Sequence, residues 1–178
     1  DGNATVFLTR LDQLKKTKDI MANAPSLADM NLVKGKNFFD KNGNRDEVTT
    51  LESGLQYEII KEGNGSSPTE EDEVEAYYTG MLLNGEVFDS VTAEANPATF
   101  KLKEVIQGWK EALQLMKMGG QWKVFVPSEL AYGVPGNNAI GPNEALVFEV
   151  ELVGITPKKN QDLIVDNNQT GSNSSFAD

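Results

Sequence analysis

The sequence predicts an α+β protein in which an antiparallel sheet wraps around one short helix and follows a small helical N-terminal segment. The first observation is a single strongly patterned helix, in which Trp109, Ala112, Leu113 and Met116 recur at i, i+3, i+4 and i+7. The second is that short segments of alternating apolar and polar residues lie on both sides of it. The third is a change from helical to strand-like periodicity at Leu51.

The first 50 residues are expected to form a helical extension with a linker helix. An apolar stripe predicts a helix over residues 9–24, which Pro25 ends because the residue before proline avoids helical backbone angles. Ser26 and Asp29 resemble a capping box and predict a second helix over residues 27–41. Three arrangements stay open: the two helices form a hairpin, lie on the sheet domain, or pair with another chain. The members of the stripe are Phe7, Leu11, Leu14 and Met21.

Residues 51–156 carry the strand periodicity of the predicted sheet domain. Asn84-Gly85 is typical of a β-hairpin, and the central helix is expected to end at Gly119-Gly120, since glycine adopts the left-handed cap conformation easily. Residues 133–143, here called the flap, are rich in glycine, proline and asparagine and predict a long ordered loop. Residues 157–178 are polar, and we expect a disordered tail. Strands are expected over residues 55–61, 73–83, 87–89, 98–102, 121–126 and 145–155.

Composition excludes several classes of chemistry. With 16 Lys and Arg against 27 Asp and Glu, the net charge of −11 makes nucleic acid and anionic membrane surfaces poor partners. The chain has no cysteine and no histidine, which excludes disulfides, thiolate nucleophiles, Ser–His triads and Cys- or His-ligated metals. No apolar run approaches the ~20 residues of a transmembrane helix. We therefore expect a site that uses no metal and no cofactor.

The candidate site consists of aromatic residues at inward-facing positions or at the ends of elements. Any one of these aromatics is more simply explained as part of the core. Tyr78 and Tyr132 favour a pocket, because a buried phenol needs a hydrogen-bond partner. Asp89 is the only carboxylate set among these apolar positions, and a solvated turn residue explains it equally well. The candidates, with two aliphatic neighbours, are Tyr78, Phe88, Phe100, Val105, Ile106, Trp109, Tyr132 and Phe148.

Five motifs in residues 51–155 closely resemble those of FKBP-type peptidyl-prolyl cis-trans isomerases, in the order of that family. They are Tyr78-Thr-Gly80, Gly85-Glu-Val-Phe-Asp-Ser90, Val105-Ile-Gln-Gly-Trp109, Ala131-Tyr-Gly133 and Gly141-Pro-Asn-Glu-Ala-Leu-Val-Phe148. Further residues resemble the macrophage infectivity potentiator branch of this family. They are Asn31, Lys34-Gly35, Phe38-Phe39, Asn42, Thr50-Leu-Glu-Ser-Gly-Leu-Gln-Tyr57, Glu111-Ala-Leu-Gln-Leu-Met116 and Val126-Pro-Ser128. That branch implies an N-terminal dimerisation region and export to the periplasm or outer cell envelope.

The resemblance implies a pocket with Trp109 as its floor and the neighbouring aromatics as its walls. The Ile106 amide and the Tyr132 hydroxyl would each donate a hydrogen bond to a substrate carbonyl. Asp89 would tether Tyr78 or polarise the twisted amide, and Ile140 would be the apolar flap residue. The flap lacks the histidine that the family often has there and carries Asn137-Asn138 instead. This departure affects what the resemblance implies about the preference of the flap and the affinity for inhibitors, but not what it implies about the pocket. Macrolides of the tacrolimus and rapamycin type are the implied inhibitors.

These observations together predict a prolyl isomerase that acts on X–Pro bonds of exported polypeptides during folding. Rotation about a peptide bond breaks no covalent bond, so an aromatic pocket without nucleophile or metal suits it. The alternative is a proline-segment-binding chaperone, or an accessory subunit of a larger complex, with little turnover. Residues 1–50 would form a homodimer or dock on another protein.

The expected location is the periplasm or outer cell envelope. The chain begins at Asp1, and we expect any export signal to have been removed already. The alternative location is a eukaryotic secretory or organellar lumen, with which four Asn-X-Ser/Thr sequons are compatible. Their asparagines are Asn3, Asn64, Asn168 and Asn173.

Overall fold

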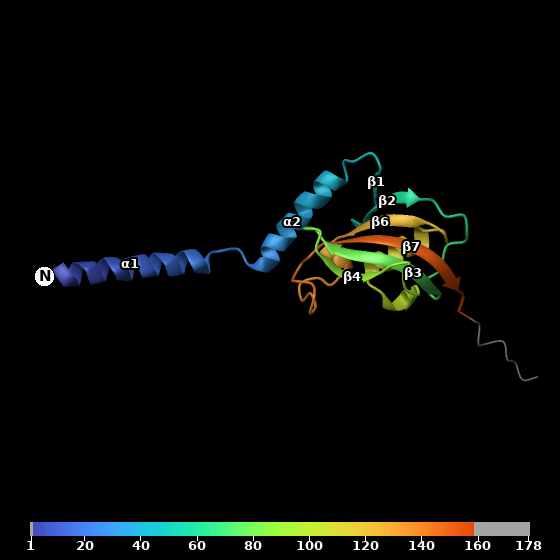
Figure 1. Ribbon diagram of the computed structural model, residues 1–178. Coiled ribbons are helices and arrows are strands. Elements are labelled where there is room, and N and C mark those ends of the chain that lie inside the picture. The colour runs from blue at the N-terminus through green and yellow to red at the C-terminus, as the bar shows by residue number, and fades with distance from the viewer. Residues whose placement is uncertain (1, 159–178) are drawn as a thin grey trace, which may run out of the picture.

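The computed structural model describes residues 2–158, and it describes side chains from Arg10 onward. The side chain of Phe7 and nearly all of the predicted disordered tail therefore lie outside the described residues. Within them the elements follow one another as helices, then strands with one central helix (Figure 1). They are α1 (Gly2–Ala22), α2 (Leu27–Asn42), β1 (Val48–Thr50), β2 (Gln56–Lys61), β3 (Glu73–Leu82), β4 (Val87–Val91), β5 (Ala98–Lys101), α3 (Gln107–Leu115), β6 (Gln121–Val126) and β7 (Leu146–Thr156), with short 3-10 helices at Leu102–Glu104 and Ser128–Leu130.

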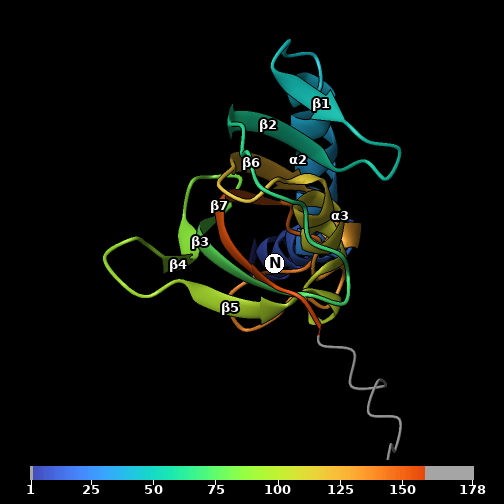
Figure 2. The same cartoon turned by 90° about the vertical axis from the view of Figure 1, so that its right-hand side faces the viewer.

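The predicted antiparallel sheet is confirmed, and residues 2–158 contribute seven strands to it. Its main order is β1-β2-β6-β7-β3-β4, and every pairing is antiparallel. The long strand β3 carries two further strands on one edge, because β5 pairs with residues 73–76 and β4 pairs with residues 78–81. The sheet curves around α3 (Figure 2). This curvature brings the inward-facing residues of β3, β4, β5 and β7 toward the same helix.

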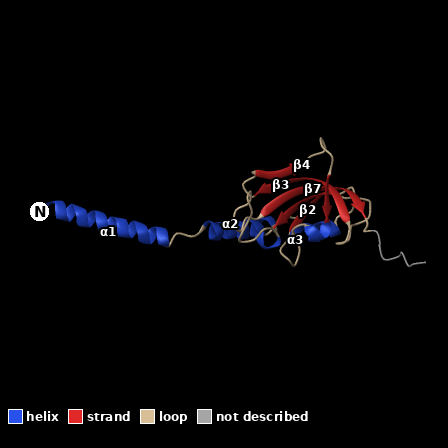
Figure 3. Ribbon diagram, turned by 90° about the horizontal axis from the view of Figure 1, so that it is seen from below, coloured by secondary structure: helices blue, strands red, loops and turns tan. Residues whose placement is uncertain are grey.

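The core lies between this sheet and α3, which packs against one face of it (Figure 3). The predicted apolar stripe of α3 is confirmed, with Trp109 at 5% exposure and Leu113 at 1%. The predicted end of the helix is wrong: α3 ends at Leu115, because Met116 adopts an extended backbone and is fully buried in the core. Gly119 does have a left-handed backbone, with φ of 87°, but in the turn that leads into β6.

Helix α2 lies on the sheet domain, which was one of the three arrangements left open. Its N-terminal capping box is confirmed: Ser26 accepts from the backbone N–H of Asp29, and the Asp29 carboxylate accepts from that of Ser26. The Phe38 ring packs 5.7 Å from the Phe125 ring, between centroids. At the end of the helix, Asn42 donates a buried 2.9 Å hydrogen bond to Gln56 of β2.

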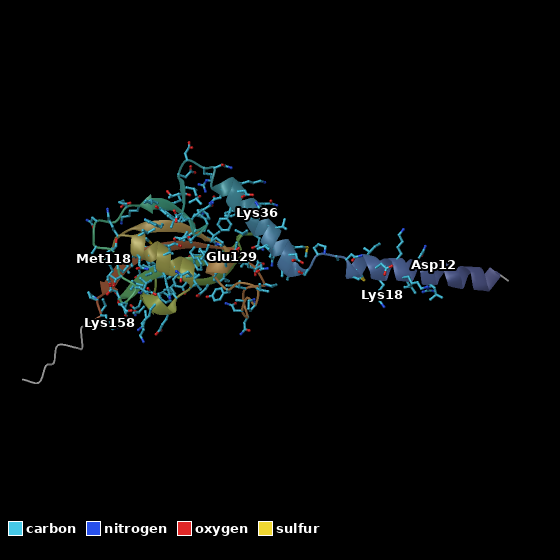
Figure 4. The ribbon with its side chains drawn as sticks, turned by 180° about the vertical axis from the view of Figure 1, so that it is seen from behind. Asp12, Lys18, Lys36, Met118, Glu129 and Lys158 are labelled. Atoms are coloured by element: carbon cyan, nitrogen blue, oxygen red, sulfur yellow. The ribbon has the colours of Figure 1, made fainter. Side chains whose placement is uncertain are left out.

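Helix α1 projects away from the domain (Figure 1). Its residues Asp12 and Lys18, which Figure 4 labels, stand well apart from the sheet. Its apolar side chains at Leu14, Ile20 and Met21 are 59–74% exposed. The described helices include none that is long and apolar enough to cross a bilayer. Strand β1 was not predicted: it consists of the three residues directly before Leu51 and extends the sheet by pairing with β2.

Candidate functional site

A cavity of about 310 Å³ opens beside the N-terminal end of α3. Nine of the ten residues proposed from the sequence line it, and they come from β3, β4, β5, β7, α3 and the segments around them. Glu104, which the sequence had not indicated, lines it as well. The nine are Tyr78, Phe88, Asp89, Phe100, Val105, Ile106, Trp109, Tyr132 and Phe148. The curved sheet therefore gathers residues that are up to 70 positions apart in the sequence.

The floor of the cavity is an aromatic cage centred on Trp109. The centroid of its ring lies 5.3 Å from Tyr78, 5.2 Å from Phe100 and 5.4 Å from Phe148, each time edge to face. Phe88 completes the cage by packing edge to face on Phe148, 5.7 Å away. Edge-to-face pairs place the positive ring edge against the negative ring face, which favours one mutual orientation. The cage is thus a pre-formed apolar surface rather than a loose set of rings.

Gly80 of β3 lies against two rings of this cage and leaves room for them because it has no side chain. A Cβ atom at this position would lie 2.6 Å from Phe88 Cζ and 2.9 Å from Phe148 Cε1. Such distances are shorter than van der Waals contact, so any larger residue would push one ring away. The sequence placed Gly80 in a family motif but gave it no role, because nothing local shows which rings a strand glycine will face.

One polar pair stands at the edge of the cage. The Tyr78 hydroxyl donates a 2.6 Å hydrogen bond to Asp89 Oδ2. Burial, and next the hydrogen bond to the Asp89 carboxylate, raise the pKa of Tyr78 well above the ordinary phenol value. The phenol therefore stays protonated and keeps donating at any physiological pH. Asp89 itself is exposed, which leaves room for a second partner at its carboxylate.

Two of the lining residues, Ile106 and Tyr132, carry hydrogen-bond donors without a partner in the described part of the chain. Tyr132 is 39% exposed, and no hydrogen bond of its hydroxyl is seen among residues 2–158. Ile106 caps the N-terminal end of α3, and the hydrogen bonds found in the described part of the chain include none donated by its backbone amide. The first N–H groups of a helix lack partners within the helix, so this end favours carbonyl or anionic oxygen. Both donors are therefore available to carbonyl groups that enter the cavity.

Ile140 is the one proposed site residue that the structure does not bring to the cavity. It is 2% exposed and packs in the core, where it anchors the flap. The flap is ordered from within by Asn137, whose side-chain oxygen accepts from the backbone amides of Ala139 and Ile140 at 2.9 Å. The position expected for the Ile140 side chain differs from the observed one because a loop has no periodicity from which the direction of a side chain can be predicted.

A larger cavity of about 540 Å³ lies between α2 and the sheet domain, with Leu32, Phe39 and Pro127 among its lining residues. It holds no cluster of aromatic rings and no pair comparable to Tyr78 and Asp89. The smaller cavity is the stronger candidate for chemistry, because an apolar floor and several polar groups converge there.

Comparison with known proteins agrees with this geometry. A family model described as "FKBP-type peptidyl-prolyl cis-trans isomerase" matches residues 64–153, and one described as "Domain amino terminal to FKBP-type peptidyl-prolyl isomerase" matches residues 4–59. The chain is 50% identical over 129 residues to the peptidyl-prolyl cis-trans isomerase Mip of Coxiella burnetii, covering 72% of this chain and 56% of that protein. It is 44% identical over 146 residues to the outer membrane protein MIP of Legionella longbeachae, covering 79% and 63%.

Solved structures show the same fold. The crystal structure of FkpA from Escherichia coli superimposes with a TM-score of 0.71 at 37% identity, covering 87% of this chain and 70% of that one. The peptidyl-prolyl cis-trans isomerase of Pseudomonas syringae pv. tomato gives a TM-score of 0.69 at 32% identity, covering 75% and 99%. The chain spans 56% and 63% of the length of the two curated relatives described above.

Proposed function

Since this chain belongs to the FKBP-type peptidyl-prolyl cis-trans isomerase family, we propose that it accelerates the cis–trans isomerisation of X–Pro bonds in polypeptides. The observation that carries the proposal is the aromatic cage around Trp109, bordered by the Tyr78–Asp89 pair and by Tyr132. Its volume of about 310 Å³ accommodates a prolyl ring with its flanking peptide groups. The prolyl ring would lie on the Trp109 face, with the peptide bond at the open rim.

The cage would act on the barrier by binding the twisted amide better than the planar one. A planar peptide bond is stabilised by charge-separated resonance, and rotation must overcome ~18–20 kcal/mol. An apolar surface disfavours the charge-separated planar form, so the difference in binding favours the transition state. No bond is broken, and the reaction needs no nucleophile or general base. The uncatalysed reaction takes roughly tens of seconds or longer, which makes it worth accelerating during folding.

The polar groups would hold the substrate while the amide rotates. Tyr132 would donate from its hydroxyl, and Ile106 from its backbone amide, to the carbonyls that flank the proline. Asp89 would either tether Tyr78 as a wall of the cage or polarise the twisted amide. Because these hydrogen bonds hold both sides of the rotating bond in place, they would lower the barrier to its rotation.

The direct test is a protease-coupled isomerisation assay on the full chain with short peptides of the form X–Pro. We expect turnover above the uncatalysed rate, with a preference for an apolar residue before proline, because that side chain would meet Val105 and Phe100. A folded protein that binds such peptides without accelerating them would overturn the proposal and leave a proline-binding module. The matched control is Leu14→Ala on the projecting helix α1, far from the cavity.

We further propose that the substrates are exported polypeptides and that the protein acts in the periplasm or outer cell envelope. Support comes from the relative named an outer membrane protein and from the likeness to the Mip and FkpA proteins. Macrolides of the tacrolimus and rapamycin type would compete for the cage, since they too would offer an apolar ring to Trp109. Inhibition of turnover by such a macrolide, with loss of competition in Trp109→Ala, is the test.

One observation favours a second activity alongside turnover. Helix α1 exposes Leu14, Ile20 and Met21 at 59–74%, so its apolar side chains lack a partner within the described chain. We propose that α1 either pairs with a second copy or holds unfolded client chains, which adds chaperone activity to the isomerase. Suppression of aggregation of an unfolded protein, with and without α1, tests this role separately from isomerisation.

A further inference from the structure

Helix α2 reaches across to the flap through a buried asparagine. Asn31 is only 7% exposed, and its Nδ2 donates a 2.9 Å hydrogen bond to the backbone carbonyl of Pro142, 111 residues later in the chain. A buried amide side chain is costly unless it is hydrogen-bonded, so a position of this kind depends on its partner. The partner here lies in the last turn of the flap, shortly before β7 begins at Leu146.

The residue after Pro142 makes a second connection to the same helix. Asn143 Nδ2 donates to the carbonyl of Ala28, in the first turn of α2, at 3.3 Å. Within residues 2–158 Asn143 is the only non-glycine residue with positive φ, at 53°, a conformation that asparagine tolerates better than most residues. A backbone held in this rarely populated region requires surrounding contacts that fix it. The hydrogen bond from Asn143 to Ala28 of α2 is one such contact.

These contacts continue from Asn143 to the cavity. The backbone N–H of Asn143 donates to the carbonyl of Gly133 at 2.9 Å, which ties the two ends of the flap together. The N–H of Gly133 donates in turn to the carbonyl of Ser128, also at 2.9 Å. Gly133 directly follows Tyr132, whose hydroxyl has no partner of its own among the described residues. The backbone around Gly133 therefore sets where the Tyr132 side chain points.

The other half of α2 is fixed to the sheet. Asn42 donates to Gln56 Oε1 at 2.9 Å in a buried contact, and Gln56 Nε2 donates back to the carbonyl of Phe39 at 3.0 Å. The capping box of Ser26 and Asp29 keeps the first turn of the helix formed. A helix held by the sheet at one end and bonded to the flap at the other is a rigid brace between them.

We propose that α2 positions the flap and Tyr132 for isomerisation, with Asn31 and Asn143 as positioning residues that never touch the substrate. The proposal rests on the proposed isomerase function and adds a structural element to it. Loss of either side-chain bond would let the flap shift while the aromatic cage, built on the sheet and α3, stays intact. Binding of the prolyl ring would then persist, while the Tyr132 hydroxyl would lose its alignment with the rotating bond.

The test uses the full chain with Asn31→Ala and Asn143→Gly, the latter chosen because glycine accepts a φ of 53°. Turnover of an X–Pro peptide is measured well below the unfolding temperature, together with amide hydrogen exchange at Gly133 and Asn143. We expect kcat to fall about three- to tenfold in each variant with KM nearly unchanged, and exchange at both amides to quicken. The double variant should lose less than the product of the two single losses, because both act through one flap. Met30→Ala, next to Asn31 but 49% exposed, is the control and should change neither readout.

Two outcomes would overturn the proposal. Faster exchange with unchanged kcat would show that the flap can loosen without affecting the reaction. The second outcome is a lower unfolding temperature, with kcat and amide exchange unchanged at temperatures where the protein is folded. It would show that the asparagines serve stability alone. Absence of turnover in the unmodified chain is a different result, since it would refute the isomerase function itself before any variant is compared. If Asn31→Ala fails to fold, Asn143→Gly decides the question alone.

Discussion

The hydroxyl of Tyr78 and the carboxylate of Asp89 meet across neighbouring strands at 2.6 Å, at the edge of an aromatic cage. In the β3–β4 register Tyr78 lies opposite Val91 and Asp89 opposite Gly80, so the pair is a diagonal contact on the inner face. The hairpin at Asn84-Gly85 joins the two strands and pairs Met81 with Val87, and a β-bulge then adds one residue to β4, so that Asp89 lies opposite Gly80. The hairpin and the bulge together bring the acidic group of the site to its partner.

We expect Asp89→Leu to lower turnover of an X–Pro peptide roughly tenfold, while the free energy of unfolding changes by about 1 kcal/mol or less. Turnover suffers because the substitution removes the acceptor of the Tyr78 hydroxyl and the carboxylate at the edge of the cage. Stability suffers little because Asp89 is exposed. Asp89→Asn separates the two roles, since it keeps an acceptor for Tyr78 and removes the charge. If turnover recovers in Asp89→Asn, the result supports the tethering of Tyr78. If turnover is equally low in Asp89→Leu and Asp89→Asn, the result supports polarisation of the amide. A loss of stability as large as the loss of activity would show that Asp89 is a structural residue.

We expect one tyrosine to ionise well above the ordinary phenol range in an alkaline titration. Burial and the bond to Asp89 favour the neutral phenol of Tyr78 and raise its pKa, so the folded protein holds this proton longer than the unfolded chain. The contribution to stability is full below the unfolded pKa of about 10 and is lost as the pH rises above it. Ultraviolet absorbance of tyrosinate follows the titration, and Tyr78→Phe should remove the late step. A titration of the same shape in both proteins would contradict this assignment.

Much of the fold could be predicted because local signals and tertiary packing agree. The start of α2 at Leu27 follows from the capping box, and the β3–β4 hairpin follows from Asn84-Gly85. Where the two conflict, packing wins: Gly119 has the conformation of a helix cap, but the core draws Met116 into an extended backbone and ends α3 earlier. Strand β1 was missed because, of its three residues, only Val48 is partly buried, which leaves no alternation to detect.

The candidate site was predictable in its members and less so in its support. Nine residues were identified because their motifs resemble a known family and their aromatic character exceeds the needs of a small core. Ile140 was placed in the pocket by the same resemblance, yet it points into the core. The contacts from Asn31 to Pro142 and from Asn143 to Ala28 join residues more than 100 positions apart. No periodicity or motif encodes such a pairing, so only the folded chain reveals it.

Gly80→Ala is expected to destabilise the protein by about 1–3 kcal/mol and to lower peptide turnover. The added methyl group would lie 2.6 Å from Phe88 Cζ, so the ring must leave its place on Phe148. The matched control is Gly35→Ala in α2, where the new Cβ would lie 3.6 Å from Ala145 Cβ in ordinary contact. Removing a helix glycine there should stabilise by about 0.5–1 kcal/mol and leave turnover unchanged. Thermal or chemical unfolding measures both, and a Gly80→Ala protein as stable and active as the parent would refute the tight fit.

Trp109→Ala is expected to damage stability and activity together. Trp109 is 5% exposed and touches three rings of the cage, so its loss leaves a cavity in the core and removes the floor of the site. Truncation of a large buried aromatic costs about 3–5 kcal/mol. Tyr132→Phe is the contrasting variant, because a residue 39% exposed contributes little to the core and should lose turnover alone. Equal ratios of activity loss to stability loss in the two variants would show that Tyr132 is no more functional than the core.

The last prediction concerns α1, and the structure decides where to cut the chain. Removing residues 1–50 would also remove α2 with its contacts to Phe125 and Gln56 and the strand β1, so any effect would mix several causes. Removing residues 1–24 takes away α1 alone and leaves the capping box at Ser26. In the full chain Leu14, Ile20 and Met21 of α1 are exposed, so this cut removes apolar surface that a partner would cover.

We expect this truncated protein to turn over a short X–Pro peptide at nearly the rate of the full chain, since the cavity and α2 are untouched. Its activity on an unfolded protein substrate should fall several-fold, because such a substrate gains from a second contact. Sedimentation at micromolar concentration should show self-association of the full chain that the truncation abolishes. A monomeric full chain would refute the homodimer and leave client or partner binding. Unchanged activity on both substrates would refute any role of α1 in holding clients.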